Sequence, residues 1–200
     1  MKLGPIMRYS MSAVLFAIKC CGVLAATLWL SACSPAMPES YQPLPTPTPL
    51  KAIQLYDQNG QTVTQDSFKG QWNLVFFGYT YCPDVCPMTL GELNKVAAGL
   101  NRDDVKVVLV SVDPERDTPQ QLKTYIEYFN PKFNAWSGEL AQVESIARQM
   151  HVFFQKQEME GTYLMDHSSQ VILVNPKGEY QGFFTAPLNV DDVVGYVDAL

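Results

Sequence analysis

The sequence predicts an α/β domain in which a mixed β-sheet is flanked by helices. Two continuous apolar runs, at 73–80 and 105–114, are typical of strands buried on both faces of a sheet. Segments with helical apolar spacing follow these runs. Towards the C-terminus, residues 169–185 predict two strands joined by a tight turn, which favours antiparallel pairing there and therefore a mixed sheet.

Residues 1–33 are predicted to be a secretory signal. The stretch 11–32 is apolar apart from Lys19 and a few small polar residues, and Arg8 precedes it. A basic start, an apolar run and small residues before a cleavage site are typical of such signals. Residues 30–33 (LSAC) resemble the bacterial lipobox, which implies lipidation of Cys33. The alternative is an uncleaved anchor, but Lys19 leaves about a dozen apolar residues after it, short of the roughly 20 that span a bilayer.

Both interpretations place the domain outside the cytoplasm, on the periplasmic side of a bacterial membrane. The cell membrane is favoured over the outer membrane. Residues 34–50 hold six prolines in seventeen positions, and we expect a spacer that forms neither helix nor sheet ladders. At about 3.1 Å per residue this linker would reach roughly 50 Å. The globular domain is then predicted over 51–200, long enough to bury a core.

The predicted domain is acidic. It carries 11 of the 14 basic and 19 of the 20 acidic side chains, a net charge of −8 against −6 for the whole chain. A nucleic-acid-binding domain requires a basic face, so this charge argues against that class of function.

The first half of the domain is predicted to hold a hairpin, a buried strand, a helix and a second buried strand, at 52–63, 73–80, 88–100 and 105–114. Apolar and polar residues alternate around Asn59-Gly60, which predicts the N-terminal hairpin. Leu90, Leu93 and Ala97 recur at helical spacing and give the first helix its apolar face.

The second half is predicted to hold two helices, a strand, a pair of strands and a final helix, at 118–130, 139–150, 152–157, 169–185 and 190–200. Thr118 is expected to cap its helix, with Pro119 at the first helical position. Asn175 to Gly178 form the turn between the paired strands.

Two cysteines, Cys82 and Cys86, lie between the first buried strand and the helix that follows it, and the predicted domain has no others. A cysteine motif at this junction is the arrangement of thioredoxin-like folds. A disulfide here would close a loop of about four residues and contribute only roughly 2 kcal/mol, so the pair would be a poor structural crosslink. At the start of a helix, with either cysteine as the cap, the thiolate is favoured and reversible oxidation is feasible.

Metal binding is the third use of the pair, since two thiolates bind soft or borderline ions together with further ligands. The domain has two histidines. His151 follows a predicted helix and is expected to be a C-terminal cap or a surface group. His167 precedes a buried strand, in the loop that faces the cysteine turn in thioredoxin-like folds. Ordinary members carry a cis-proline in that loop, but residues 132–175 contain no proline, and His167 is predicted to be a ligand.

Three collinear stretches, 76–90, 110–122 and 165–178, closely resemble the Sco/SenC copper-chaperone family, a thioredoxin-like group. The resemblance covers essentially all of 51–200. It implies that Cys82, Cys86 and His167 bind one copper ion per domain, as Cu(I) or Cu(II). It also implies delivery of copper to the copper A subunit of cytochrome c oxidase, or upkeep of that centre's thiols, and a periplasmic copper donor as a second partner. Asp113 would orient the site or recognise a partner.

Two thiolates and one imidazole suit trigonal Cu(I). They also suit Cu(II) when one oxygen ligand is added, whereas structural zinc requires a fourth ligand. Asp84, Asp166 or water could supply it, so zinc stays open. Met88 and Met165 flank the motifs and are expected to fill the core. Three protein ligands leave a coordination position through which a partner can attack, as a transfer protein requires.

The alternative function is a membrane-tethered thiol–disulfide oxidoreductase or a redox sensor that uses the same cysteines. Their spacing, C-x3-C, differs from the C-x2-C of thioredoxin-type reductases. His167 separates the two functions, because copper transfer needs it and dithiol exchange largely does not. A thiol peroxidase is not favoured, since Val75 and Tyr79 stand where its Pro and Thr would be. The domain is thus predicted to be primarily a binding and transfer protein rather than an enzyme.

Overall fold

The two apolar runs form the centre of the sheet as neighbouring parallel strands. β4 (Trp72–Gly78) and β5 (Val105–Ser111) pair from Trp72 opposite Val105 to Gly78 opposite Ser111. All seven residues of β4 are buried, which explains why the run lacks any polar alternation. Both strands end at the same edge of the sheet, where the chain turns into the cysteine motif and into the segment that begins at Val112.

The structure is a computed structural model, and it describes residues 37–200. The predicted signal, the lipobox and Cys33 lie outside the described residues. Within the described range, no helix combines the length and the apolar character needed to cross a membrane.

Six further strands complete an eight-stranded sheet in the order β1-β10-β9-β4-β5-β6-β2-β3. These are β1 (Tyr41–Pro49), β2 (Gln54–Asp57), β3 (Thr62–Thr64), β6 (Asn134–Ser137), β9 (Val171–Val174) and β10 (Glu179–Phe184). The β4–β5 and β5–β6 pairs are parallel and the others are antiparallel. The predicted mixed sheet and the β2–β3 hairpin are therefore confirmed.

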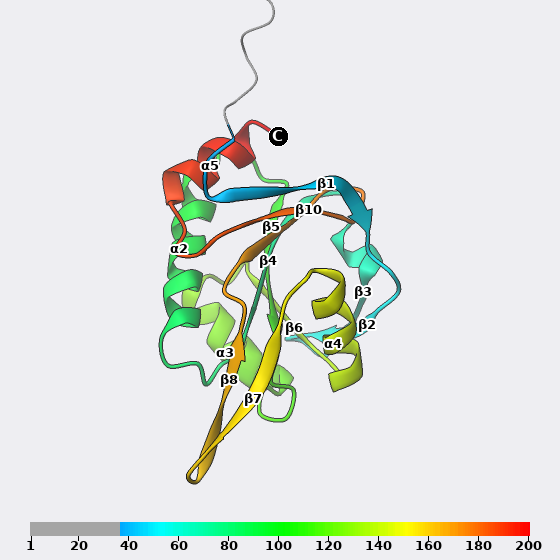
Figure 1. Ribbon diagram of the computed structural model, residues 1–200, viewed down its shortest axis with the longest axis vertical. Helices are drawn as coiled ribbons and strands as arrows, with labels where there is room; N and C mark the ends of the chain where they lie inside the picture. Colours follow the sequence, from blue (N-terminus) through cyan, green and yellow to red (C-terminus); the bar gives the residue numbers. More distant parts are fainter. Residues whose placement is uncertain (1–36) are drawn as a thin grey trace, which may run out of the picture. The chain divides into compact units, whose positions relative to one another are not determined.

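Helices cover both faces of this sheet (Figure 1). They are α2 (Val85–Gly99), α3 (Pro119–Phe129), α4 (Leu140–Gln149) and α5 (Val190–Asp198), with a short 3-10 turn, η2 (Gln65–Phe68). α2 contacts both α3 and α5 on one side, and α4 lies on the other side of the sheet beside β2. Thr118 caps α3 as predicted, because its hydroxyl accepts the Gln121 N–H.

The proline-rich segment differs from its prediction. Residues 41–49 form β1, which pairs antiparallel with β10 at the edge of the sheet. Tyr41 is 3% exposed and its ring packs 4.9 Å from that of Phe184. Prolines are tolerated because an edge strand leaves one row of N–H positions unpaired, and the register is interrupted between Pro43 and Thr48. The expectation of a spacer is therefore wrong for 41–49.

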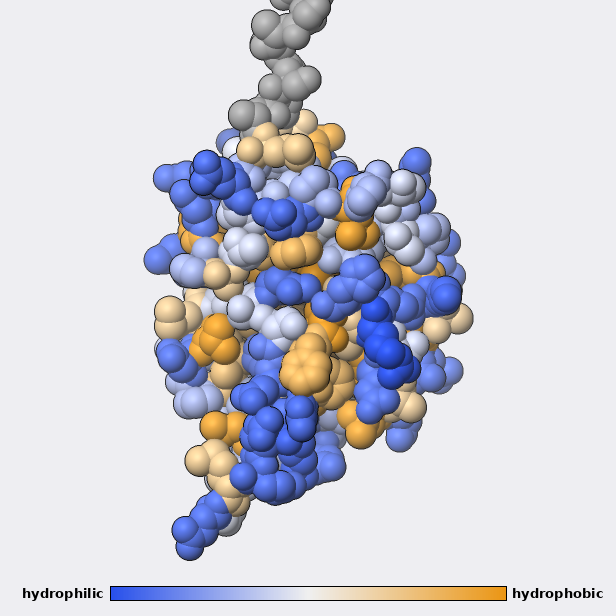
Figure 2. All heavy atoms as spheres, viewed as in Figure 1, coloured by the Kyte–Doolittle hydropathy of each residue, from blue (hydrophilic) through white to orange (hydrophobic). Residues whose placement is uncertain are grey.

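A second antiparallel pair, β7 (Phe154–Met159) and β8 (Thr162–His167), forms a separate two-stranded sheet. It projects from the domain at the lower end of Figure 1, and its far end is hydrophilic in Figure 2. The sequence predicted part of β7 but placed His167 in a loop, whereas His167 is the last residue of β8. Most residues of β7 are exposed, so this hairpin lacks the apolar run that revealed β4 and β5.

Candidate metal centre

Cys82, Cys86 and His167 come together where β4 leads into α2 and where β8 ends. One ligand atom from each lies within 4.8 Å of the other two. Cys86 Sγ is 3.3 Å from His167 Nε2. In the part of the chain that the structure describes, this is the one group of three or more His, Cys, Asp or Glu side chains with such geometry. These are the three residues that were predicted from the sequence to be metal ligands.

The turn between β4 and α2 places the two sulfurs at different depths. Cys82 lies on the turn before the helix and is partly exposed, whereas Cys86 is the second residue of α2 and is fully buried. The Cys86 N–H points at Cys82 Sγ over 3.4 Å, so a helix-start donor faces the outer sulfur. Gly78 makes room behind Cys86, because a Cβ there would lie 3.0 Å from the Cys86 sulfur.

The helix begins differently from the prediction that a cysteine caps it. Asp84 occupies the N-cap position, although its side chain makes no capping hydrogen bond. Pro87 is then the third helical residue, where a backbone N–H has no partner within the helix in any case. The proline therefore removes no helical hydrogen bond, and both sulfurs stay at the helix start.

The pKa values of the two thiols are shifted in opposite directions. The hydrogen bond from Cys86 lowers the pKa of Cys82 to about 4 against the effect of burial. The same hydrogen bond, together with burial, raises the pKa of Cys86. Both residues are free thiols. The outer sulfur is therefore the more acidic of the two.

The imidazole of His167 is oriented by backbone and aromatic contacts. Its Nδ1 lies 3.0 Å from the Ser168 carbonyl oxygen, a contact that favours a proton on Nδ1 and a lone pair on Nε2. The rings of Phe76 and Tyr79 meet the imidazole edgewise, each with centroids 6.0 Å away. The nitrogen that faces Cys86 is thus the one suited to bind a metal ion.

Asp117 fixes the turn that carries the cysteines. Its buried carboxylate accepts hydrogen bonds from the Thr80 N–H at 3.1 Å, the Thr80 hydroxyl at 2.7 Å and the Ser111 hydroxyl at 2.6 Å. Burial raises the pKa of Asp117. The carboxylate links the ends of β4 and β5.

Asp113 lies outside the ligand group and binds two other side chains. It is 2% exposed, forms an ion pair with Arg116, and accepts a 2.7 Å hydrogen bond from the Tyr163 hydroxyl. Because Tyr163 belongs to β8, Asp113 connects the segment after β5 to the hairpin that carries His167. This supports an orienting role for Asp113. Arg116 was not predicted as a site residue, because its contacts with distant segments cannot be read from the sequence.

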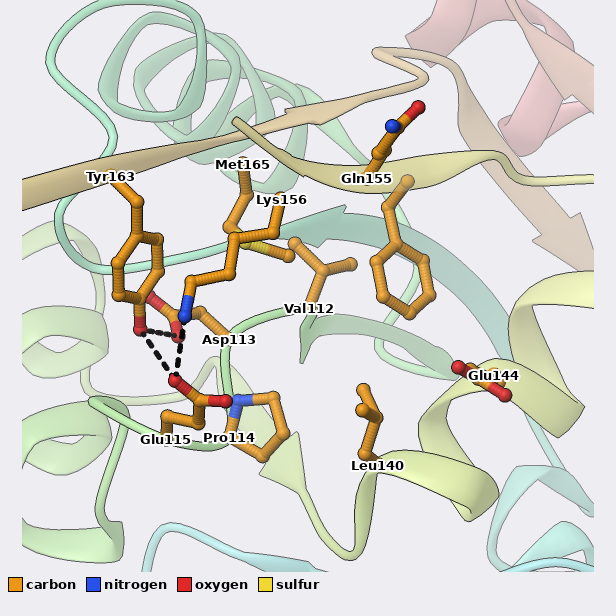
Figure 3. A pocket seen from close by; sticks show the side chains of 11 residues that line it. Val112, Asp113, Pro114, Glu115, Leu140, Glu144, Gln155, Lys156, Tyr163 and Met165 are labelled. Atoms are coloured by element: carbon orange, nitrogen blue, oxygen red, sulfur yellow. Dashed lines mark hydrogen bonds and ion pairs between the residues drawn. The ribbon is translucent and has the colours of Figure 1, made fainter. Parts of the chain in front are cut away.

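A cavity of about 250 Å³ lies beside this connection, between the hairpin and the start of α4. Figure 3 shows Tyr163, Glu115 and Lys156 at one end of it, joined by hydrogen bonds and an ion pair. Its lining includes Asp113 and Met165 but none of the three predicted ligands.

The other candidates lie outside the ligand group. His151 follows α4, with a left-handed φ of 53° and an exposed side chain, as expected for a helix-end or surface residue. Asp84 and Asp166 also fall outside. Met165 is buried as predicted, but Met88 is 56% exposed, so the core-filling prediction is wrong for Met88. The side chain of Met88 points to solvent because apolar positions on the other face of α2 already fill the core.

The model of the SCO1/SenC family matches residues 46–200, which include the cysteine turn, Asp113 and His167. A candidate copper-binding protein of Stutzerimonas stutzeri is 38% identical over 152 residues, 74% of each chain. ScoI of Bradyrhizobium japonicum, solved with copper bound, is 35% identical, with a TM-score of 0.69 over 75% of this chain and 98% of that one. Apo Sco1 of Thermus thermophilus is 32% identical, with a TM-score of 0.73 over 83% and 99%. These likenesses confirm the predicted thioredoxin-like fold.

Proposed function

Because the chain belongs to the SCO1/SenC family, we propose that it binds one copper ion through Cys82, Cys86 and His167 and passes it on during assembly of cytochrome c oxidase. The observation that carries this proposal is the convergence of the three ligand atoms within 4.8 Å. Copper is here the cargo of the protein. The copper-bound structure of the Bradyrhizobium japonicum relative supports copper over zinc as the ion.

The donor set suits copper in a form that can be handed on. Two sulfurs and one imidazole nitrogen satisfy Cu(I) in a trigonal arrangement, and Cu(II) accepts the same set with an added oxygen. Cys82 is the accessible member, whereas the sulfur of Cys86 is buried against β4. A partner thiolate or imidazole would therefore approach from the Cys82 side and replace the outer ligand first.

The family resemblance indicates which protein receives the copper. It supports delivery to the copper A subunit of cytochrome c oxidase, or upkeep of that centre's thiols, with a periplasmic protein as the donor. The proposal includes a lipid anchor at Cys33 that tethers the domain on the periplasmic side of the membrane. Fractionation of cells that express Cys33→Ala tests this part, because loss of the lipid should release the protein from the membrane fraction.

A second function, thiol–disulfide exchange, is favoured by the cysteines themselves. The pKa of Cys82 is lowered to about 4, and Cys86 lies next to it as a free thiol. A thiolate with an adjacent resolving thiol can attack a disulfide and then release the product. Thiol–disulfide exchange needs no imidazole ligand, so a variant that has lost copper binding through the histidine can still carry it out.

Copper titration and disulfide reduction by the purified full-length protein separate the two functions. His167→Ala should weaken copper binding and change the thiolate-to-copper absorption band, while its rate of disulfide reduction stays near that of the wild type. Cys82→Ser and Cys86→Ser should lose both activities. Unchanged copper affinity in His167→Ala would refute the proposed copper site and leave dithiol exchange as the function.

A further inference from the structure

The guanidinium group of Arg116 lies between the two segments that carry the proposed copper ligands. Its Cζ is 3.6 Å from the ring centroid of Tyr163 and 4.7 Å from that of Tyr81. Tyr81 directly precedes Cys82, and Tyr163 lies in β8 four residues before His167. One cation therefore contacts both the cysteine turn and the histidine hairpin, at distances typical of cation–π interactions.

Arg116 is held in this place by specific partners. Nε forms an ion pair with the buried carboxylate of Asp113, and Nη1 donates a 3.2 Å hydrogen bond to the Tyr163 carbonyl oxygen. Nη2 is buried and has no hydrogen-bonding partner among the described residues. The guanidinium group is thus held by Asp113 and by the Tyr163 carbonyl oxygen, with tyrosine rings close to its Cζ.

A third ring links Arg116 to the imidazole. Tyr79 lies 5.8 Å from the guanidinium carbon, and its hydroxyl accepts the Met165 N–H at 3.2 Å. The same ring meets His167 edgewise. Arg116 therefore packs against three tyrosines. Tyr81 precedes Cys82 in the sequence, the Tyr79 ring contacts His167, and Tyr163 lies on the strand that ends at His167.

The contacts of Arg116 are important because of how the β7–β8 hairpin is attached. Apart from its covalent connections, the hairpin contacts the rest of the domain mainly through side chains. Neither strand pairs with the eight-stranded sheet in the region that the structure describes. Hydrogen bonds from β8 to the rest of the domain join Tyr163 to Asp113, Glu115 and Arg116, and Met165 to Tyr79, besides the contact between His167 and Cys86. Lys156 of β7 adds an exposed ion pair with Glu115. These links hold β8, and with it His167 at the base of the hairpin, against the segment that follows β5.

We propose that Arg116 is a positioning residue for the copper site, holding the cysteine turn and the histidine hairpin together so that the imidazole stays over the two sulfurs. The inference rests on the proposed copper binding at Cys82, Cys86 and His167. Arg116 acts through Tyr81 and Tyr163 and does not itself touch the ion. Its loss should therefore mimic the loss of His167.

The test compares Arg116→Met with Arg102→Met in the full-length protein. Arg102 forms a comparable ion pair with Asp104 and donates to the Val197 carbonyl oxygen, and none of these residues belongs to the ligand group or contacts Arg116. We expect Arg116→Met to raise the Kd for copper by about 10–100-fold, as loss of outer-shell groups around a metal does, and to shift the copper absorption band towards that of His167→Ala. Arg102→Met should keep the wild-type Kd and band.

A double-mutant cycle makes the test specific. In the His167→Ala background, Arg116→Met should have little further effect on copper affinity, because the ligand that it positions is already absent. An equal loss of affinity in both backgrounds, or wild-type affinity in Arg116→Met, would overturn the proposal. If Arg116→Met does not fold, Arg116→Lys replaces it and should also weaken binding, since lysine keeps the charge but not the planar contact.

A copper-free measurement keeps this inference separate from the proposed function. In the apo protein, amide hydrogen exchange in β7 and β8 should be faster in Arg116→Met than in the wild type or in Arg102→Met. Faster exchange would support the link between the hairpin and the domain even if the wild type bound no copper. Unchanged exchange would contradict that link whatever the copper affinity.

Discussion

Cys86 Sγ and His167 Nε2 lie 3.3 Å apart although the residues are separated by 81 positions in the chain. The sulfur is carried by the first turn of α2 and the imidazole by the last residue of β8. Two groups of side chains maintain this contact. Asp117 fixes the turn that leads to the cysteines, while Asp113 and Arg116 bind the hairpin that ends in the histidine.

Gly78 should be required for the position of the inner sulfur. A Cβ at Gly78 would lie 3.0 Å from the Cys86 sulfur and 3.0 Å from the Phe76 ring. We expect Gly78→Ala to lower the free energy of unfolding by about 1–3 kcal/mol, as overpacking of a core does, and to weaken copper binding. Urea denaturation and copper titration measure the two effects.

Gly91→Ala is the matched control for Gly78→Ala. It lies within α2, and a Cβ there has nothing within 4 Å. Alanine is the better helix former by about 1 kcal/mol, so this variant should be at least as stable as the wild type and should bind copper normally. Equal effects of the two substitutions would refute the steric argument.

Cys82 should be the reactive thiol of the apo protein. Its pKa is lowered to about 4 and its side chain is partly exposed, whereas the pKa of Cys86 is raised and its side chain is buried. At pH 6, iodoacetamide should therefore label Cys82 first, as peptide mapping by mass spectrometry would show. Cys86→Ala removes the main hydrogen bond that lowers the pKa, and labelling of Cys82 at pH 6 should slow. Preferential labelling of Cys86 would contradict the structure.

Asp117 should make stability depend on pH. Burial raises the pKa of this carboxyl in the folded protein above the value of about 4 expected in the unfolded chain. The folded state therefore binds the proton more tightly, and the contribution of this group to stability is largest at low pH and is lost as pH rises through the folded pKa.

Asp117→Asn tests this sign. Relative to the variant, the wild type should gain free energy of unfolding as pH falls from 7 to 4, measured by urea denaturation across that range. A difference that stays constant with pH, or that grows as pH rises, would show that the hydrogen bonds from Thr80 and Ser111 outweigh burial.

Tyr41 tests whether the proline-rich segment belongs to the domain. Its ring is buried against Phe184 and against Tyr196, with centroids 4.9 Å and 4.4 Å away. Tyr41→Ala should lower the free energy of unfolding by about 3–5 kcal/mol, the range for loss of a buried aromatic side chain. Pro45→Ala, at an exposed position of the same strand, should change stability by less than about 0.5 kcal/mol. Similar small effects at both positions would mean that the segment is a free spacer.

The elements that the sequence revealed are those whose burial is continuous or periodic. β4 and β5 appear as apolar runs because both of their faces are covered, and α3 appears through Thr118, Pro119 and a regular apolar stripe. β1 was missed because proline content argues against a strand, and at a sheet edge this argument fails.

The ligand set was predicted because the family resemblance and the strand–helix junction agreed on the same residues. Arg116 could not be found in this way. Its partners Tyr81 and Tyr163 lie in different segments, and the carbonyl of Tyr163 that it binds is 47 positions away. Only the folded hairpin brings them together, and a lone arginine before a helix cap carries no signal of that contact.

X-ray absorption spectroscopy of the copper-loaded full-length protein tests the central claim most directly. We expect one copper per chain, with two sulfur ligands and one imidazole nitrogen, and we expect the imidazole contribution to disappear in His167→Ala. A copper environment with no imidazole in the wild type, or one that is the same in His167→Ala, would contradict it.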